Sequence, residues 1–182
     1  MYIALLLAAV ALSGCTAMAP EYRPSYESAQ DFRDAGSGKV AVGQFKADKD
    51  DEPAVTEMRL RGSSMESPYG SYSAYLKHAL ERQLQESQRL DPSSDAVVSG
   101  VLLKNAVDIN GFSVGTSSMK ARFMVHRGGK PIYDKVHAAQ HEWPSSFTGV
   151  TAFEALFSNY HVTVQKLIAS LFGDKEFQAA VK

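Results

Sequence analysis

The chain has 182 residues, of which 45% are apolar and 21% are charged, and it contains 13 Gly, 7 Pro and a single Cys. This composition is typical of one compact domain, and it excludes a disulfide scaffold, which needs several cysteines. The 19 Lys and Arg against 20 Asp and Glu leave a net charge of −1. The protein therefore has no overall field that would attract nucleic acid or an anionic membrane surface.

Residues 2–12 form an unbroken apolar run of eleven residues. A membrane-spanning helix needs about twenty, whereas a run of this length is typical of the hydrophobic part of a secretory signal peptide. Ser13 and Gly14 supply the small residues that precede a cleavage site. No Lys or Arg precedes the run, which departs from the usual pattern. We expect residues 1–14 to be a signal peptide.

Residues Leu12, Ser13, Gly14 and Cys15 resemble the lipobox of bacterial lipoproteins. The resemblance implies that the Cys15 thiol receives a diacylglyceryl group and becomes the mature N-terminus. Two or three acyl chains hold a protein on a bilayer firmly, since each buried methylene contributes about 0.8 kcal/mol. Thr16 rather than Asp follows Cys15, which by resemblance to enterobacterial sorting implies the periplasmic face of the outer membrane. The alternative is an unmodified thiol in a discarded leader.

Residues 15–38 contain two prolines, several Ser, Glu and Asp, and a closing Gly-Ser-Gly at 36–38, with no sustained apolar period. We expect this segment, with the lipidated cysteine at its start, to be a flexible tether. A flexible chain of this length reaches roughly 25 Å. Residues 39–182 are then expected to form a single domain.

The body begins with a β-branched apolar run at residues 39–45, which predicts a buried strand, and residues 55–61 alternate as an edge strand does. Ser71 can cap a helix whose apolar residues recur at helical spacing. The apolar run from residue 96 to 103, extended to 109, predicts a further buried strand. The Asn-Gly pair that follows it predicts a turn.

Residues 119–126 alternate between apolar and polar side chains, and Gly128 and Gly129 then lead into a further run at residues 132–143. This pattern predicts a β-hairpin with a two-residue turn. Such a turn fixes a register in which one face of the hairpin is apolar throughout, with the pairs Val125–Ile132, Ala121–Val136 and Met119–Ala138. The same register sets Arg122 opposite Lys135, an unfavourable pair unless an acidic residue lies near.

Thr151 and Glu154 form a capping box, which predicts a long helix that Gly173 terminates. Asp174 can cap a final short helix that carries Phe177. The order of elements predicts an α+β fold, in which a largely antiparallel sheet of about four strands is covered on one face by two amphipathic helices.

Several local strings together resemble the small proteobacterial outer-membrane lipoproteins of the YajG-like type. They are the lipobox at Cys15, VAVGQF at 40–45, SPYGSYSAYLKHALERQL at 67–84, GGKPIYDK at 128–135, and AFEALF and LIASLFGDKEF in the C-terminal region. The resemblance covers most of residues 39–178. It implies a non-enzymatic protein, and it transfers one functional residue, Cys15.

The outer face of the predicted sheet, away from the helices, gathers basic and aromatic side chains that could meet an anionic glycan, a lipid headgroup or a protein. This candidate partner surface consists of Lys120, Arg122, Tyr133, Lys135, His137, His141 and Trp143. The alternative is an ordinary polar sheet surface.

Two patterns invite a catalytic interpretation. His137 and His141 stand four residues apart, a spacing that holds zinc on a helix, but in a strand a metal would need a further ligand such as His126. A solvated histidine pair is the alternative. Residues 111–115 match the G-x-S-x-G pattern of hydrolases, but the following segment alternates as a strand, which favours a turn.

The sequence thus predicts no catalytic residue, no metal, no cofactor and no nucleic-acid partner. We expect a lipid-anchored envelope lipoprotein that faces the periplasm and serves as a non-enzymatic binding or assembly accessory for an envelope protein or glycan. The alternative function is a metal-binding enzyme that uses a histidine cluster on the sheet face. A weaker one is a carrier of acyl chains.

Overall fold

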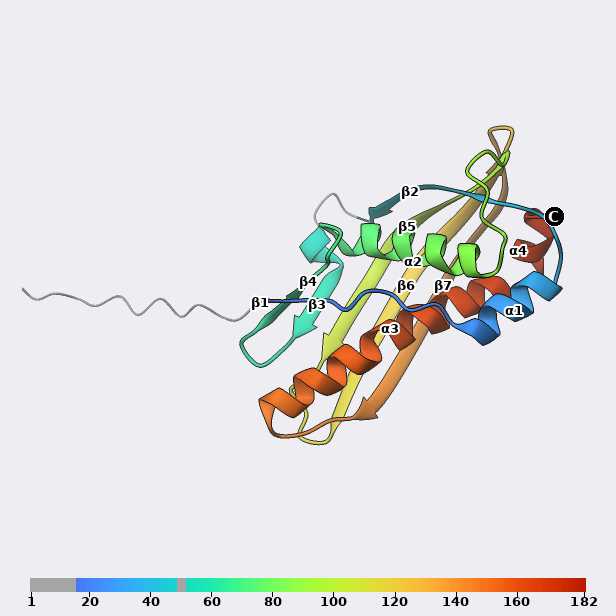
Figure 1. Ribbon diagram of the computed structural model, residues 1–182. Coiled ribbons are helices and arrows are strands. Elements are labelled where there is room, and N and C mark those ends of the chain that lie inside the picture. The colour runs from blue at the N-terminus through green and yellow to red at the C-terminus, as the bar shows by residue number, and fades with distance from the viewer. Residues whose placement is uncertain (1–15, 49–51) are drawn as a thin grey trace, which may run out of the picture.

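A computed structural model describes residues 16–48 and 52–182 (Figure 1). A single 3-10 turn is formed by Glu52–Ala54 in the described chain. The strands and helices in chain order are β1 Thr16–Met18, α1 Tyr26–Asp34, β2 Ala41–Ala47, β3 Thr56–Arg59, β4 Ser64–Glu66, α2 Tyr72–Glu86, β5 Ala96–Asp108, β6 Val114–Arg127, β7 Lys130–Pro144, α3 Gly149–Gly173 and α4 Lys175–Ala180.

The main sheet has five strands in the order β2-β5-β6-β7, with β3 also paired to β5. β5, β6 and β7 form an antiparallel meander. β2 and β3 run parallel to β5 and follow one another along the same edge of it, at residues 97–102 and 105–108. β1 and β4 form a separate parallel pair. The expected α+β fold with a largely antiparallel sheet is confirmed.

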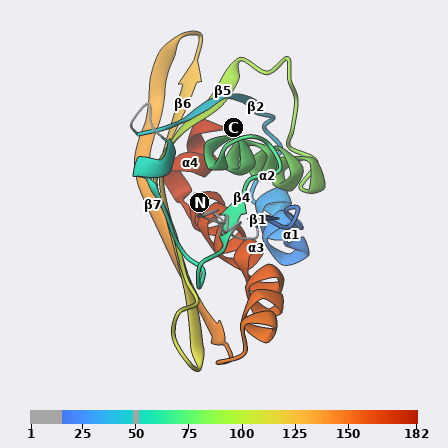
Figure 2. The same cartoon turned by 90° about the vertical axis from the view of Figure 1, so that its left-hand side faces the viewer.

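The helices of the described chain lie on one side of the main sheet (Figure 2). α2 and α3 are the two predicted amphipathic helices, and their apolar stripes are fully buried from Leu76 to Leu84 and from Leu156 to Leu171. Burying each such side chain contributes about 1.5–3 kcal/mol. Ser71 caps α2 as predicted, since its Oγ accepts a 3.1 Å hydrogen bond from the Ala74 N–H.

α3 starts earlier than expected but ends where expected. Its N-cap is Thr148 rather than Thr151, so the predicted capping box is not formed. Gly173 is its last residue, and the Asp174 carboxylate then caps α4 by accepting a 2.8 Å hydrogen bond from the Glu176 N–H. The C-terminal helix pair is therefore confirmed in order, with one boundary moved.

The expectation of a flexible tether at residues 15–38 was wrong for residues 16–38, the described part of that segment. β1 and α1 lie within it, and Ala19, Tyr22 and Phe32 are buried. The Tyr22 hydroxyl donates a 2.6 Å hydrogen bond to the side chain of Gln83 in α2. The segment is polar because only a narrow stripe of it is buried, and it is ordered by partners some sixty residues away.

A buried arginine joins this N-terminal segment to the C-terminus. Arg89 is 3% exposed, and among the described residues its guanidinium donates hydrogen bonds to main-chain carbonyl oxygens alone. It also lies over the Phe32 ring, with 4.3 Å between Cζ and the ring centroid. The carbonyl groups that accept from it are those of Phe32, Gly36, Gly38 and Val181.

The β6–β7 hairpin has the predicted two-residue turn but a different register. Gly128 and Gly129 both have positive φ angles, of 56° and 79°, as a tight hairpin turn requires. Beyond the turn a β-bulge leaves Ile132 without a partner, so Val125 pairs with Tyr133. Pro131, which has no N–H to donate to the ladder, directly precedes the unpaired residue. The predicted register was wrong by one residue along the rest of the hairpin.

Two sequence-based expectations, the signal peptide and the lipidated cysteine, concern residues 1–15. The signal peptide and Cys15 lie outside the described residues. Within residues 16–48 and 52–182, no helix has both the length and the apolar content needed to cross a membrane.

Replacing Arg89 by Met should lower the free energy of unfolding by about 2–4 kcal/mol, because four carbonyl groups, two of them in buried hydrogen bonds, lose their donor. Urea denaturation of the purified protein measures this. Arg82→Met is the matched control, since Arg82 is exposed on α2, and it should change stability by less than about 0.5 kcal/mol. Equal losses in the two variants would show that Arg89 does not hold the segment.

Candidate functional site

The residues of the candidate partner surface do not share one face. Because the bulge at Ile132 shifts the register, alternate residues of β7 exchange sides. Lys120 and Arg122 are exposed on the open face of the sheet, as expected. The five members from β7 point instead toward the helices, and they are Tyr133, Lys135, His137, His141 and Trp143. The prediction that these seven residues form a single basic and aromatic face was therefore wrong.

The bulge also removes the like-charge pair that the predicted register implied. Arg122 lies opposite Val136 rather than Lys135. Its guanidinium donates two hydrogen bonds, of 2.6 and 2.5 Å, to the Asp134 carboxylate. These bonds lower the pKa of Asp134. The charge of Arg122 is thus matched by an acidic neighbour on the same face.

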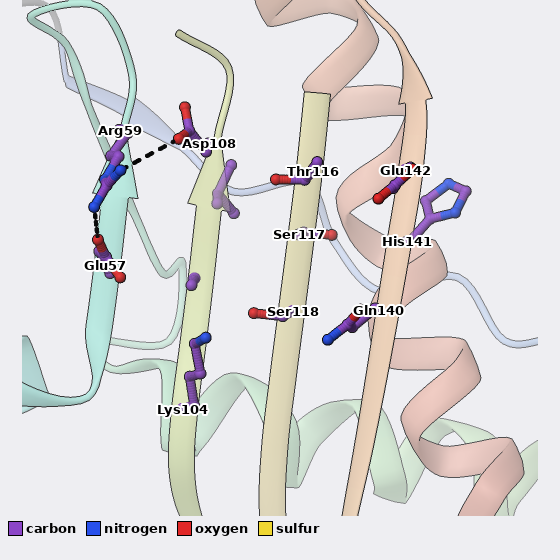
Figure 3. Close-up of a pocket in the computed structure, with 12 residues that line it drawn as sticks. Glu57, Arg59, Lys104, Asp108, Thr116, Ser117, Ser118, Gln140, His141 and Glu142 are labelled. Carbon is purple, nitrogen blue, oxygen red and sulfur yellow. Dashed lines mark hydrogen bonds and ion pairs between the residues drawn. The ribbon is translucent and has the colours of Figure 1, made fainter. Parts of the chain in front are cut away.

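The open face of the sheet is hollowed where β3, β5, β6 and β7 come together (Figure 3). The cavity has a volume of about 320 Å³. The side chains of Ser118 and Gln140 lie side by side across β6 and β7, as their pairing requires. The main polar residues that line the cavity are Glu57, Arg59, Lys104, Asp108, Thr116, Ser118, Gln140 and Glu142.

Charges of both signs line this cavity. Arg59 is fixed between two carboxylates, at 2.6 Å from Glu57 and 3.6 Å from Asp108. Lys104 and Glu142 make no ion pair within the described residues. A site with hydroxyl, amide, cationic and anionic groups can exchange several hydrogen bonds with a polar partner.

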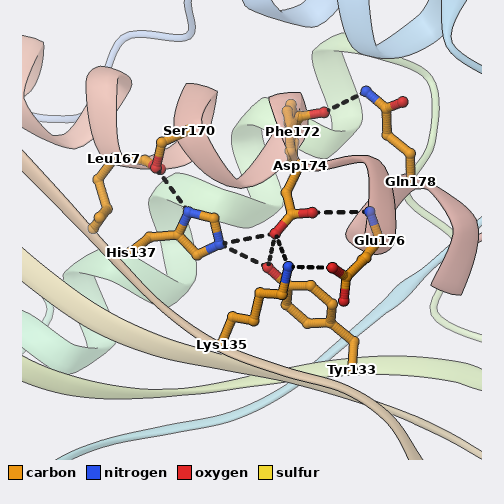
Figure 4. Close-up of polar contacts among 9 residues, drawn as sticks. All are labelled: Tyr133, Lys135, His137, Leu167, Ser170, Phe172, Asp174, Glu176 and Gln178. Carbon is orange, nitrogen blue, oxygen red and sulfur yellow. Dashed lines mark hydrogen bonds and ion pairs between the residues drawn. The ribbon is translucent and has the colours of Figure 1, made fainter.

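A second cluster of polar groups lies between β7 and the α3–α4 corner (Figure 4). Asp174 is at its centre, because it accepts hydrogen bonds from the Tyr133 hydroxyl at 3.0 Å and is 3.2 Å from the Lys135 ammonium group. Lys135 also pairs with Glu176 at 2.8 Å. The His137 Nε2 lies 2.6 Å from the Tyr133 hydroxyl. We call this set the α4 latch, since it fastens α4 to the sheet.

The latch shifts the pKa values of its members. Burial, followed by the hydrogen bond to Asp174, raises the pKa of Tyr133 well above its usual range. Burial alone would raise the pKa of Asp174, but the bonds from the Glu176 N–H, Lys135 and Tyr133 outweigh it and lower that pKa. Burial lowers the pKa of His137, and the attraction of Asp174 does not compensate.

The two hydroxyl groups that contact His137 donate their hydrogen atoms to other acceptors. Tyr133 uses its one hydroxyl hydrogen on Asp174, and Ser170 uses its own on the Leu167 carbonyl at 2.7 Å. Both ring nitrogens of His137 contact these two hydroxyl groups. All four bonds coexist only when both ring nitrogens carry a proton, whereas burial favours the neutral ring.

The histidine cluster of the metal hypothesis does not assemble. His137 and His141 share a side of β7, but His126 belongs to the other face of the sheet. The ring nitrogens of His141 contact the Asn159 side chain at 2.9 Å and the Lys166 ammonium group at 3.1 Å. Within residues 16–48 and 52–182, no three His, Cys, Asp or Glu side chains are grouped as metal ligands.

Sequence reasoning missed the acidic partners of Arg122 and Lys135. Asp134, Asp174 and Glu176 neutralise Arg122 and Lys135, but Asp174 was assigned only to a helix cap. One signal was present, because the like-charge pair of the predicted register already required a nearby acid. The cavity left no local signal, since its residues come from four strands between Glu57 and Glu142.

The latch predicts that the protein loses stability in mild acid. The native pKa of His137 lies below its ordinary value of 6.5, so the unfolded chain binds the proton first and the free energy of unfolding falls as the pH drops through that range. Denaturation at pH 7.5 and pH 5 should show a smaller loss in His137→Gln than in the parent. His126→Gln should keep the parent's full loss, and an unchanged loss in His137→Gln would contradict the assignment.

No family model matches the chain, and no curated protein is similar to it in sequence. Among solved structures, protein XCC0632 from Xanthomonas campestris, assigned to the DUF330 family model, is 12% identical with a TM-score of 0.54, over 86% of this chain and 94% of that one. This likeness shows a shared fold alone.

Two further similar structures have TM-scores below 0.5, so no conclusion about this chain is drawn from them. Protein CT253 from Chlamydia trachomatis is 13% identical with a TM-score of 0.45, over 76% of this chain and 97% of that one. A minor lipoprotein from Acinetobacter baumannii is 12% identical with a TM-score of 0.44, over 79% and 92%.

Proposed function

We propose that this protein is a lipid-anchored lipoprotein of the bacterial cell envelope, which binds a partner on the open face of its sheet and catalyses no reaction. The observation that carries the proposal is the cavity of about 320 Å³ on a sheet face that no described helix covers. The described helices cover the other face, so the open face is the side on which the sheet itself is accessible to a partner.

The chemistry of the open face favours a polar partner. Arg59, Lys104 and Glu142 offer both signs of charge at the cavity, and Ser118 and Gln140 offer hydroxyl and amide groups. Lys120 and Arg122 extend the same face beyond it. An envelope protein or glycan presents the hydrogen-bonding groups that such a surface matches.

The proposed anchor is Cys15, and the outer membrane is its proposed location. Support comes from the sequence LSGC after an apolar run of signal-peptide length, with Thr16 next. The first described residue, Thr16, belongs to a strand of the folded body. An acyl group on the preceding residue would thus attach the body to the lipid surface at close range.

The non-enzymatic part of the proposal rests on how the candidate catalytic groups are placed. Ser113 of the G-x-S-x-G pattern is exposed in a loop that leads into β6, whereas a nucleophile elbow leads into a helix. His137, the candidate metal ligand, is held in the latch against α3 and the α3–α4 corner. Within the described residues, no histidine contacts Ser113.

The binding face is tested by crosslinking in intact cells. A photoreactive residue at Gln140, in the cavity, should form one specific adduct, while the same residue at Ser158, exposed on α3, should not. Arg59→Ala with Lys104→Ala should weaken the adduct from Gln140, because two cationic groups are lost, whereas Lys77→Ala on α2 should leave it unchanged. Equal adducts from Gln140 and Ser158 would contradict this binding face.

The anchor is tested by metabolic labelling with radioactive palmitate. The parent should incorporate label and float with membranes, because acyl chains on the cysteine partition into the bilayer. Cys15→Ala should do neither. The conservative Thr16→Ser variant is the control and should behave as the parent. An unmodified N-terminal peptide in the mass spectrum of the mature parent would overturn the anchor.

A further inference from the structure

A cluster of exposed apolar side chains lies at one end of the molecule. It consists of Phe112 and Val114, where the chain enters β6, and of Phe147 and Val150, where it enters α3. Phe112, Phe147 and Val150 are 72%, 71% and 69% exposed. The two phenyl rings stack on each other, with centroids 5.3 Å apart and planes 12° apart. We call this cluster the aromatic tip. Contiguous exposed apolar groups of this kind mark an interaction surface.

The tip is held in place rather than left on two loose loops. Arg61, at a positive φ of 55°, donates hydrogen bonds to the carbonyls of Ile109 and Gly111 in one loop and of Ser146 and Phe147 in the other. The Ser145 N–H also donates to the Ser113 carbonyl at 2.8 Å. The stacked pair is therefore preorganised, so a partner pays little ordering entropy on contact.

The tip also carries a cation. Within residues 16–48 and 52–182, no carboxylate pairs with Arg61. Its guanidinium donates to carbonyl oxygens and therefore keeps its net positive charge. Phenylalanine and aliphatic side chains beside a basic residue are a combination that proteins use to insert at the boundary between lipid headgroups and acyl chains.

Thr16, the first described residue, lies on the same side of the molecule as this tip. Thr16 pairs with Ser64 in the β1–β4 ladder, and Ser64 is three residues from Arg61, a distance that an extended chain spans in at most about 11 Å. Figure 1 shows the start of β1, the turn before β4 and the start of α3 on the same side of the molecule, and Figure 2 looks at that side.

From this arrangement we propose that the aromatic tip inserts into the same lipid leaflet that holds the acyl chains on Cys15. The proposal rests on the proposed lipid anchor and adds to it a second contact, made by side chains, that fixes how the body is oriented on the membrane. A single acyl attachment leaves the body able to rotate about one point. A second contact, displaced from the first, limits that rotation to the axis through the two contacts.

The test places a tryptophan at the tip of the full, lipidated protein and reconstitutes it into phosphatidylcholine vesicles with or without brominated acyl chains, which quench tryptophan at headgroup and acyl depth. Phe147→Trp should lose most of its added emission in the brominated vesicles. Tyr26→Trp is the matched control, since Tyr26 is similarly exposed but lies on α1, away from the start of α3, and it should lose none. The native Trp143 contributes the same background to both.

A second variant separates insertion from mere proximity. Phe112→Ser in the Phe147→Trp protein removes the stacked ring and should reduce the quenching, while flotation with the vesicles stays unchanged. If the protein floats but the emission of Phe147→Trp is not quenched, insertion of the tip is overturned and the lipid anchor is retained. Protein that does not float overturns both. A blue shift without quenching means that a second copy of the chain covers the tip, and it overturns lipid insertion.

Discussion

One extra residue in β7 determines what each side of the sheet presents. Ile132 has no partner in β6, so every later residue of β7 is displaced by one position and points to the opposite side. The displacement places Tyr133 and His137 beneath α3 and α4, and it leaves Asp134 beside Arg122. Without the bulge, the α4 latch would have no members on the sheet, and Arg122 would face Lys135.

The sequence could predict the elements of this hairpin but not its register. Alternation located both strands, and the Gly128-Gly129 pair located the turn, because these signals are local. A bulge changes the count of residues in one strand only, and the alternation in β7 is too weak to show it, since Val136 and Ala138 are exposed while Lys135 and His137 are turned inward. Pro131 and the like-charge conflict were the two available signs, and both are explained by the bulge.

The N-terminal segment shows a different limit. Helices α2 and α3 were found because each buries a long apolar stripe that is visible in a short window. α1 buries only Ala29 and Phe32, and its order depends on Gln83 and Arg89, which lie in distant parts of the chain. Composition alone therefore classed the segment as a tether. The cavity on the open face was missed for the same reason, since it exists only once β3 and β7 flank the central strands.

The ordered N-terminal segment changes what a lipid anchor would do. A flexible tether would let the body move freely above the membrane, whereas β1 joins the residue after Cys15 directly to β4, and Tyr22 fastens the next part of the chain to α2. The anchor would thus be attached on the side of the helices, next to the two loops whose carbonyl groups accept hydrogen bonds from Arg61. The open face belongs to the same rigid body through β3 and β5. Its direction relative to the membrane would then be set by the fold, which suits a protein that must present one surface to a partner within the envelope.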